Sequence, residues 1–365
     1  MNKIFKFVIV AGLIFISVTC NKNTSEDDSF IDDEPPLSND AFMSSRYYNP
    51  VIDHNCPDPS VIDDRDRTGY FYIYSTQNGT SGTPNCVYLP VYRSKDLVTW
   101  EFIADAFGPD RPQWREGSRM WAPDINYING KYVLYYSLGI WEESYQSASG
   151  VAVSDSPTGP FEDIGMIVGF ENTGVWNSID ANFVDTGDGK FLFWGSFGIN
   201  SGIWAIELND DGLAIKSGAE KTYIGANNME GTYVHKRPDG YYYIFTSKGS
   251  CCSGKESTYH VVVARSKEIL GPYESPTGKP LTDSDYDYTV LHSSADNIFR
   301  GTGHNAEFIR DDSGQDWMPY HSYWSGNGYN GRSLNIDKVF WKEDGWPYFE
   351  GKSPSVSGEG PKWRK

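Results

Sequence analysis

An internal repeat of aromatic, strand-like segments constrains the fold of this chain more than any other feature. Most of these segments begin near a glycine or lysine and end in or near a serine; they are GYFYIYST (69–76), KYVLYYS (131–137), KFLFWGS (190–196), YYYIFTS (241–247) and DWMPYHSYW (316–324). A second strand-like run follows each segment, and no sustained helical period appears outside the N-terminal segment. Residues that favour β-strands therefore recur through most of the chain.

A short polar motif precedes each aromatic segment, and these motifs recur about every 50–75 residues. Their key residues are Asp58, Asp124, Asp180, Glu230 and His304. Five repeats of a strand-rich unit predict an all-β fold, a five-bladed β-propeller. Because the first strand of each blade lies nearest the propeller axis, the five motifs should meet in one central funnel.

The composition restricts the partners of such a chain. Its formal net charge is −18, so nucleic acids and anionic membrane surfaces should repel it. Aromatic residues make up 15% of the sequence, and flat aromatic side chains are suited to packing against sugar rings. We therefore expect a neutral polymer as the partner, and no nucleic acid.

The N-terminal segment has the layout of an export signal. Lys3 and Lys6 precede an apolar run at 7–19 that is short for a membrane span, and Cys20 follows directly. We expect a signal peptide at 1–19, a flexible tether at 20–42 that is lipid-anchored at Cys20, and the propeller at 43–365. The expected location is the cell envelope of a Gram-negative bacterium, through the outer membrane; secretion and an uncleaved anchor are alternatives.

Four further cysteines, Cys56, Cys86, Cys251 and Cys252, remain in the exported part of the chain. Export permits disulfides, but the spacing leaves the pairing open, including a bond between the adjacent Cys251 and Cys252. No spacing typical of a zinc site appears.

Three of the motif acids have surroundings that suit glycoside hydrolysis, which needs a protonated acid and an ionised carboxylate. Glu230 lies beside Met229, and an apolar neighbour helps an acid to keep its proton. Asp58 lies between two prolines in a rigid turn, which suits a fixed base, and Asp180 could raise the pKa of Glu230. The alternative is that these acids are ordinary turn residues, and for Asp124 this alternative is equally strong.

The motifs CPDPSV, WAPDI, NSIDANF, MEGTYV and GTGHN, with the CCSGKESTYHVVVARSK stretch, resemble those of glycoside hydrolase family 43, and most of all its endo-acting α-1,5-L-arabinanases. The resemblance covers residues from about 50 to 350 and implies a five-bladed propeller that inverts anomeric configuration. It implies that Asp58 is the general base, Glu230 the general acid and Asp180 the residue that adjusts the pKa of the acid. It also implies that His304 helps to hold a calcium ion on the propeller axis, directly or through water.

The resemblance further implies a set of substrate-lining positions: Trp121, Gly150, Asn177, Ser178, Gly195, Ser196 and Phe197. The chain departs from the family pattern at Pro57, Thr232 and Thr302, and residues 138–149 lack the usual short phrase rich in glycine and serine. These departures leave the acids in place and affect the expected shape of the substrate site.

The sequence therefore predicts a monomeric endo-α-1,5-L-arabinanase that acts on arabinan or arabino-oligosaccharides. The alternatives are an exo-acting α-L-arabinofuranosidase or β-xylosidase of the same family, and a propeller that binds glycan without cutting it. The three acids argue against the last alternative, because a binding protein does not need them.

Overall fold

The computed structural model describes residues 42–79 and 85–364. The chain separates into two units, Met1–Asp40 and Ala41–Lys365, and the described residues belong to the second. The predicted signal segment, Cys20 and the tether up to residue 41 lie outside the described residues. None of the helices in the described part has the length and the apolarity that a bilayer crossing requires.

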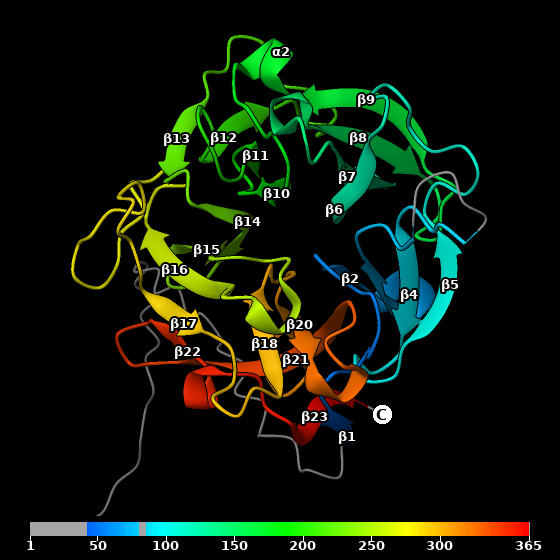
Figure 1. Ribbon diagram of the computed structural model, residues 1–365, viewed down its shortest axis with the longest axis vertical. Helices are drawn as coiled ribbons and strands as arrows, with labels where there is room; N and C mark the ends of the chain where they lie inside the picture. Colours follow the sequence, from blue (N-terminus) through cyan, green and yellow to red (C-terminus); the bar gives the residue numbers. More distant parts are fainter. Residues whose placement is uncertain (1–41, 80–84, 365) are drawn as a thin grey trace, which may run out of the picture. The chain divides into compact units, whose positions relative to one another are not determined.

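The described residues form six antiparallel sheets, and Figure 1 shows the larger ones in a ring coloured from blue to red. The first large sheet contains β2 (Ser60–Asp64), β3 (Tyr70–Tyr74), β4 (Pro90–Ser94) and β5 (Glu101–Asp105). The second contains β6 (Arg119–Ile128), β7 (Lys131–Gly139), β8 (Ala148–Ser154) and β9 (Glu162–Val168). The third contains β10 (Asn182–Asp185), β11 (Lys190–Trp194), β12 (Ile203–Leu208) and β13 (Thr222–Gly225).

The remaining large sheets follow in chain order. The fourth contains β14 (Met229–Lys236), β15 (Tyr242–Lys248), β16 (His260–Ser266) and β17 (Thr289–Leu291). The fifth contains β18 (Phe299–Gly303), β19 (Ile309–Arg310), β20 (Asp316–Trp324), β21 (Arg332–Trp341) and β22 (Pro347–Tyr348). The helical segments are short: α1 (Arg65–Thr68), α2 (Phe170–Thr173), η2 (Ser144–Gln146), η3 (Gly254–Glu256), η4 (Ser325–Asn327) and η5 (Glu350–Lys352).

The hydrophobic core is divided among the seams between neighbouring large sheets. One cluster joins Tyr72 and Val91 of the first sheet to Leu134 of the second, and equivalent clusters fill the following three seams. A fifth cluster, which includes Phe71 of the first sheet and Leu334 of the last, closes the ring. Burying apolar surface on both faces of every sheet explains why the strands carry long aromatic and aliphatic runs.

A sixth, two-stranded sheet pairs the two ends of the described chain, β1 (Phe42–Tyr48) and β23 (Ser357–Arg364). It lies beside the seam between the last and first large sheets (Figure 1). The prediction of an all-β propeller is confirmed. The structure has one sheet more than the five predicted repeats, because β1 and β23 lie outside the repeats and no repeated pattern marks them.

Candidate active site

Each large sheet has, at or near the start of its inner strand, a residue with left-handed backbone conformation, which we call the entry residue. The φ angles lie between 40° and 61° at five residues, which are Asp58, Ala122, Asp180, Gly231 and His304. Four of them carry side chains, for which this conformation is strained and is held only by surrounding contacts. The five entry residues therefore share one backbone conformation, and this conformation identifies the equivalent position in each sheet.

The entries are fixed by hydrogen bonds from one blade to the next. The amide of the entry residue donates to a side chain at the end of the preceding blade's second strand in four of the five cases. These bonds are Ala122 to Thr76 (2.8 Å), Asp180 to Ser137 (3.1 Å), His304 to Ser247 (2.8 Å) and Asp58 to His321 (3.1 Å). This explains why most of the aromatic segments end in or near a serine or threonine.

The remaining entry departs from this plan and thereby positions an acid. Ser196 lies where the acceptor for Gly231 is expected, but its hydroxyl donates to Oε2 of Glu230 at 2.5 Å. The Gly231 amide donates instead to Oδ2 of Asp180 at 3.1 Å. Glu230 and Asp180 are thus connected through one backbone amide.

Comparison of the five entry residues shows that the key residues of the sequence motifs do not all occupy equivalent positions. Asp58, Asp180 and His304 are equivalent, but Glu230 precedes its entry residue by one position and Asp124 follows its entry residue by two. A shift of one residue in a strand turns a side chain to the other face, so equal spacing of motifs does not mean equal placement of side chains.

Asp124 lies in a second ring of hydrogen bonds farther along the inner strands. In this ring a side chain of each blade accepts the amide of the next blade. The bonds are Ile125 to Ser60 (3.0 Å), Phe183 to Asp124 (2.9 Å), Val234 to Asn182 (3.0 Å), Phe308 to Tyr233 (3.1 Å) and Val61 to Glu307 (2.7 Å). Asp124 therefore braces the ring, which favours the turn-residue alternative over sugar contact.

Asp58 is surrounded by groups that stabilise its ionised form. Arg332 Nη1 donates to Oδ1 at 2.7 Å, and the Thr76 hydroxyl donates to Oδ2 at 2.6 Å. His304 Nδ1 lies 3.1 Å from the same Oδ1. Burial opposes ionisation, but Arg332 and His304 outweigh it and hold the pKa of Asp58 well below its usual range.

The pKa of Glu230 is shifted in the opposite direction. Burial raises its pKa, and the hydrogen bonds from Ser196 and from Tyr259, whose hydroxyl donates to Oε1 at 3.0 Å, offset only part of this. Asp180 is also buried, and burial together with the charges of Glu230 and Asp58 raises its pKa to about 7, although His304 opposes the rise. The buried Asp180–Glu230 pair therefore retains a proton at a pH at which Asp58 has none.

The two histidines of the site differ in charge. Asp58 and Asp180 raise the pKa of His304 to about 9 against the effect of burial, so His304 is a cation at neutral pH. Burial and Arg332 lower the pKa of His321 to about 4. Neutral His321 accepts the Asp58 amide through Nδ1, so its 3.3 Å approach to the Asp58 carboxylate is not an ion pair.

The described residues do not form a cage for calcium. No group of three or more His, Cys, Asp and Glu side chains suited to a metal occurs in residues 42–79 and 85–364. His304 directs Nδ1 at Asp58, and calcium prefers 6–8 oxygen ligands, so only an ion held largely through water fits these side chains. Arg332 and His304 already supply positive charge beside the carboxylates.

The predicted substrate-lining residues separate into two groups. Trp121, Asn177 and Phe197 are partly exposed. The others are buried: Ser178 donates to Val175 O, Ser196 binds Glu230, and Gly195 packs so closely that a Cβ would lie 1.9 Å from Gly202 O. Gly150 is also buried, and a side chain there would meet the Tyr136 hydroxyl and Trp114.

The structure adds three contacts to the site that no sequence argument identified. Arg332 and Thr76 bind Asp58, and Tyr259 binds Glu230. Tyr259 lies within the CCSGKESTYHVVVARSK stretch that carries the family resemblance, which is a signal that could have found it. Arg332 and Asp58 are 274 residues apart, and no local pattern joins them.

The cysteines are also placed by the structure. Cys251 and Cys252 form a disulfide between adjacent residues. Cys56 is buried and Cys86 is partly exposed, and both are free.

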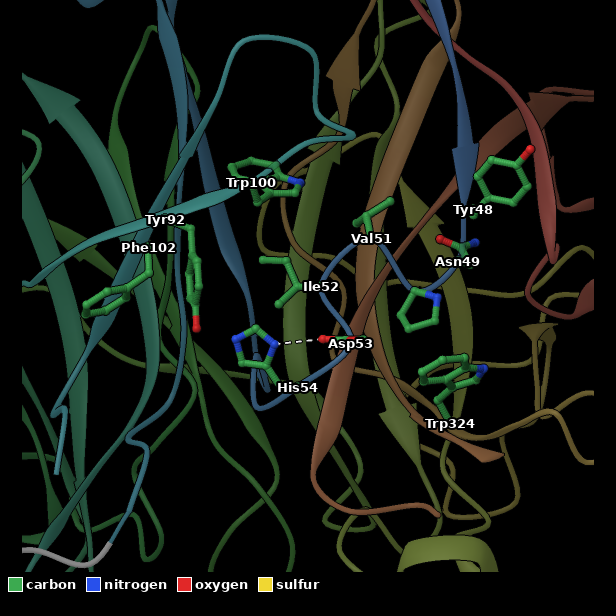
Figure 2. Close-up of a pocket in the computed structure, with 11 residues that line it drawn as sticks. Tyr48, Asn49, Val51, Ile52, Asp53, His54, Tyr92, Trp100, Phe102 and Trp324 are labelled. Atoms are coloured by element: carbon green, nitrogen blue, oxygen red, sulfur yellow. Dashed lines mark hydrogen bonds and ion pairs between the residues drawn. The ribbon is translucent and has the colours of Figure 1, made fainter. Parts of the chain in front are cut away.

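A cavity of about 520 Å³ lies along the segment that leads from β1 to the first blade, and the three carboxylates are not among its lining residues in the described chain. Figure 2 shows His54, Tyr92 and Phe102 on one side of this segment and Tyr48 and Trp324 on the other. The cavity is therefore separate from the carboxylate site.

Comparison with known proteins is consistent with this geometry. The profile of "Glycosyl hydrolases family 43" matches residues 47–347. An extracellular exo-α-(1→5)-L-arabinofuranosidase of Cellvibrio japonicus is 30% identical, with 77% of this chain and 83% of that protein covered. An extracellular endo-α-(1→5)-L-arabinanase of Bacillus subtilis is 27% identical, with 85% of this chain and 73% of that protein covered.

A solved structure of an arabinanase resembles this chain in fold. The Cellvibrio cellulosa α-L-arabinanase in complex with arabinohexaose has a TM-score of 0.70 and 28% identity, with 82% of this chain and 96% of that chain covered. Since the family profile spans most of the sequence and the fold is that of a propeller, the chain belongs to glycosyl hydrolases family 43.

Proposed function

We propose that this protein is an inverting glycoside hydrolase that cuts α-1,5-L-arabinofuranosidic linkages within arabinan. The observation that carries the proposal is the opposite surroundings of the buried Asp58 and Glu230 carboxyl groups, which shift their pKa values in opposite directions. Arg332 keeps Asp58 ionised, whereas burial keeps a proton on the Asp180–Glu230 pair. The names of the arabinan-cleaving relatives support arabinan as the substrate.

The proposed reaction is a single displacement. Asp58 accepts a proton from water, which attacks the anomeric carbon, while Glu230 donates its proton to the leaving oxygen. The carboxylate of Asp180 holds the backbone beside Glu230 and adds negative charge, which favours the protonated form of the acid. An inverting mechanism requires the Asp58 and Glu230 carboxyls to lie roughly 6.5–9.5 Å apart, so that water fits between base and sugar.

The endo mode is the finer part of the proposal, and an exo mode is the second candidate. Curated endo-arabinanases of Bacillus subtilis and Thermotoga petrophila support the endo mode, whereas the Cellvibrio japonicus relative is named as exo-acting. Product length after brief digestion of linear arabinan separates the two. Mixed oligosaccharides early in the reaction would support the endo mode, and one short product throughout would support the exo mode.

The catalytic roles are tested with Glu230→Gln and Asp58→Asn. Each should keep the fold and lose about 10²–10⁴-fold in kcat on arabinan. An aryl arabinofuranoside with a good leaving group should partly rescue Glu230→Gln but not Asp58→Asn, because only the first lacks protonation of the leaving group. Near-normal turnover of arabinan by Glu230→Gln would disprove its role as the acid.

A calcium ion near His304 stays a prediction. Such an ion would brace the funnel and, because it binds only the folded protein, would raise the melting temperature. Chelation followed by calcium add-back tests this. Metal-free protein with full activity and an unchanged melting temperature would show that His304 acts only as the charged neighbour of Asp58.

We further propose that the five large sheets are the blades and that the β1–β23 sheet is a clasp. Five seam clusters and five inter-blade amide bonds support this count.

Export is supported by relatives named as extracellular, and lipidation of Cys20 can be tested by labelling with a radioactive fatty acid in the wild type and in Cys20→Ser. A monomer is expected and can be checked by light scattering.

A further inference from the structure

The loop that joins β7 to β8 exposes two large aromatic side chains. Trp141 is 65% exposed and Tyr145 is 45% exposed, although most aromatic residues of the described chain are buried or half-buried. This loop lies within residues 138–149, the stretch that departs from the family pattern. Exposed apolar rings that are held in place by neighbouring aromatic residues indicate a surface for a ligand with apolar faces.

Trp141 extends the aromatic surface of Trp121. Their ring centroids are 6.0 Å apart and the rings are nearly perpendicular, at 80°. Trp121 lies across Gly139, where a Cβ would come within 1.9 Å of Cε3 and Cζ3 of its indole. The missing side chain at Gly139 therefore lets the Trp121 ring lie over strand β7 and meet Trp141.

Tyr145 makes the equivalent contact on the other side of the loop. Its ring centroid lies 5.9 Å from that of Trp176, and Trp176 lies 6.4 Å from Phe170, which is 47% exposed. A single loop thus joins two aromatic clusters that begin on different blades.

Both clusters begin beside the carboxylate site. Trp121 directly precedes the entry residue Ala122, whose amide donates to the Thr76 hydroxyl that also binds Asp58. Trp176 precedes Asn177, in the segment that leads to Asp180. Both clusters therefore begin on chain segments that also carry or hold the carboxylates.

We propose that Trp121, Trp141, Tyr145, Trp176 and Phe170 form a platform that binds arabinofuranosyl units away from the bond that is cut. The platform rests on the proposed function, and its residues would let the site distinguish a long arabinan chain from a short oligosaccharide. Apolar faces of sugar rings pack on the exposed rings, and the neutral side chains suit a neutral polymer. The platform raises the efficiency of cleavage of arabinan relative to short oligosaccharides.

The test compares arabinotriose with linear arabinan in Trp141→Ala, Tyr145→Ala and the double variant. Each loss of a ring should lower kcat/KM on arabinan by about 3- to 10-fold, mainly through KM, while arabinotriose changes by less than about 2-fold. Trp141→Phe should restore most of the effect. The matched control is Tyr127→Ala, which removes a ring of 42% exposure near the other end of β6 and should change neither substrate.

Equal losses on both substrates, or no loss on arabinan in the double variant, would overturn the platform. A binding measurement separates this result from failure of the proposed function. In the Glu230→Gln background, a native gel that contains arabinan should retard the protein, gels that contain xylan or galactan should not, and Trp141→Ala should weaken the retardation by arabinan. If the wild type cuts no arabinan but arabinan still retards it through Trp141, the proposed reaction is wrong and the platform stands.

Discussion

At the residue scale, the site depends on how one carboxylate is kept charged while a nearby pair keeps a proton. Arg332 and His304 flank Asp58, whereas Ser196 and Tyr259, which are neutral, bind Glu230. A charged partner shifts a buried carboxyl group toward ionisation far more than a neutral hydroxyl does. The opposite pKa shifts of Asp58 and Glu230 therefore follow from their partners and not from the acids themselves.

Arg332→Gln tests this division through the pH dependence of activity. Removing the guanidinium removes an interaction that favours ionised Asp58, so the pKa of Asp58 rises. Since activity requires ionised Asp58, the acidic limb of the kcat/KM profile should move to higher pH, by about 1–3 units. Arg310→Gln, which removes an arginine paired with Asp316, is the control, and an acidic limb that is unmoved in Arg332→Gln would contradict the assignment.

At the element scale, each inner strand carries two functions in succession. Its entry holds a residue at positive φ near the funnel, and a residue two or three positions later bonds to the next blade. Asp124 and Glu307 are both acids of this second ring. Burial has the larger effect and the charge of Asp124 the next, and together they raise the pKa of Glu307 well above its usual range. Carboxyl groups near the axis are therefore of two kinds, those of the funnel and those that join blades.

Asp124→Ala should destabilise the fold without a catalytic defect. The substitution leaves the partly buried Phe183 amide without its acceptor, which costs about 1–3 kcal/mol in the free energy of unfolding. Asp124→Asn keeps an acceptor oxygen and should cost less. Denaturant unfolding and kcat per folded molecule check both points; a loss of kcat in Asp124→Asn comparable to that of Asp58→Asn would place Asp124 in the reaction instead.

At the scale of the whole molecule, the ring must be closed between the last and first blades. The clasp strand β23 contacts both of these blades. On the last blade, the Lys362 amide donates to Asp311. On the first blade, the centroid of the Trp363 ring lies 4.9 Å from that of Phe71, and Trp363 Nε1 donates to Asp96 O. Because the seam cluster includes Trp363, the clasp is part of the core and not a surface ribbon.

Trp363→Ala should therefore lower the free energy of unfolding by about 3–5 kcal/mol, as expected for loss of a buried tryptophan. Phe102→Ala, which removes a ring of 51% exposure from the first blade, should change it by no more than about 0.5 kcal/mol. Equal stability of the two variants in urea would show that the seam closes without the clasp.

The sequence by itself determined the all-β repeat, the positions of the acids and the family. Strand propensity, turn residues and a long-period repeat are local or regularly spaced signals, and they can be recognised without coordinates. The roles of Asp58 and Glu230 stay predictions, which the proline neighbours of Asp58 and the methionine beside Glu230 suggested before their partners were known.

Only the tertiary structure decided which side chains meet. It placed Arg332 on Asp58 across 274 residues, placed Asp124 at the junction between blades and paired β1 with β23. Each outcome depends on strand phase or on closure of the ring. A shift of one residue reverses the face of a side chain, and closure joins segments whose only relation is their proximity in space.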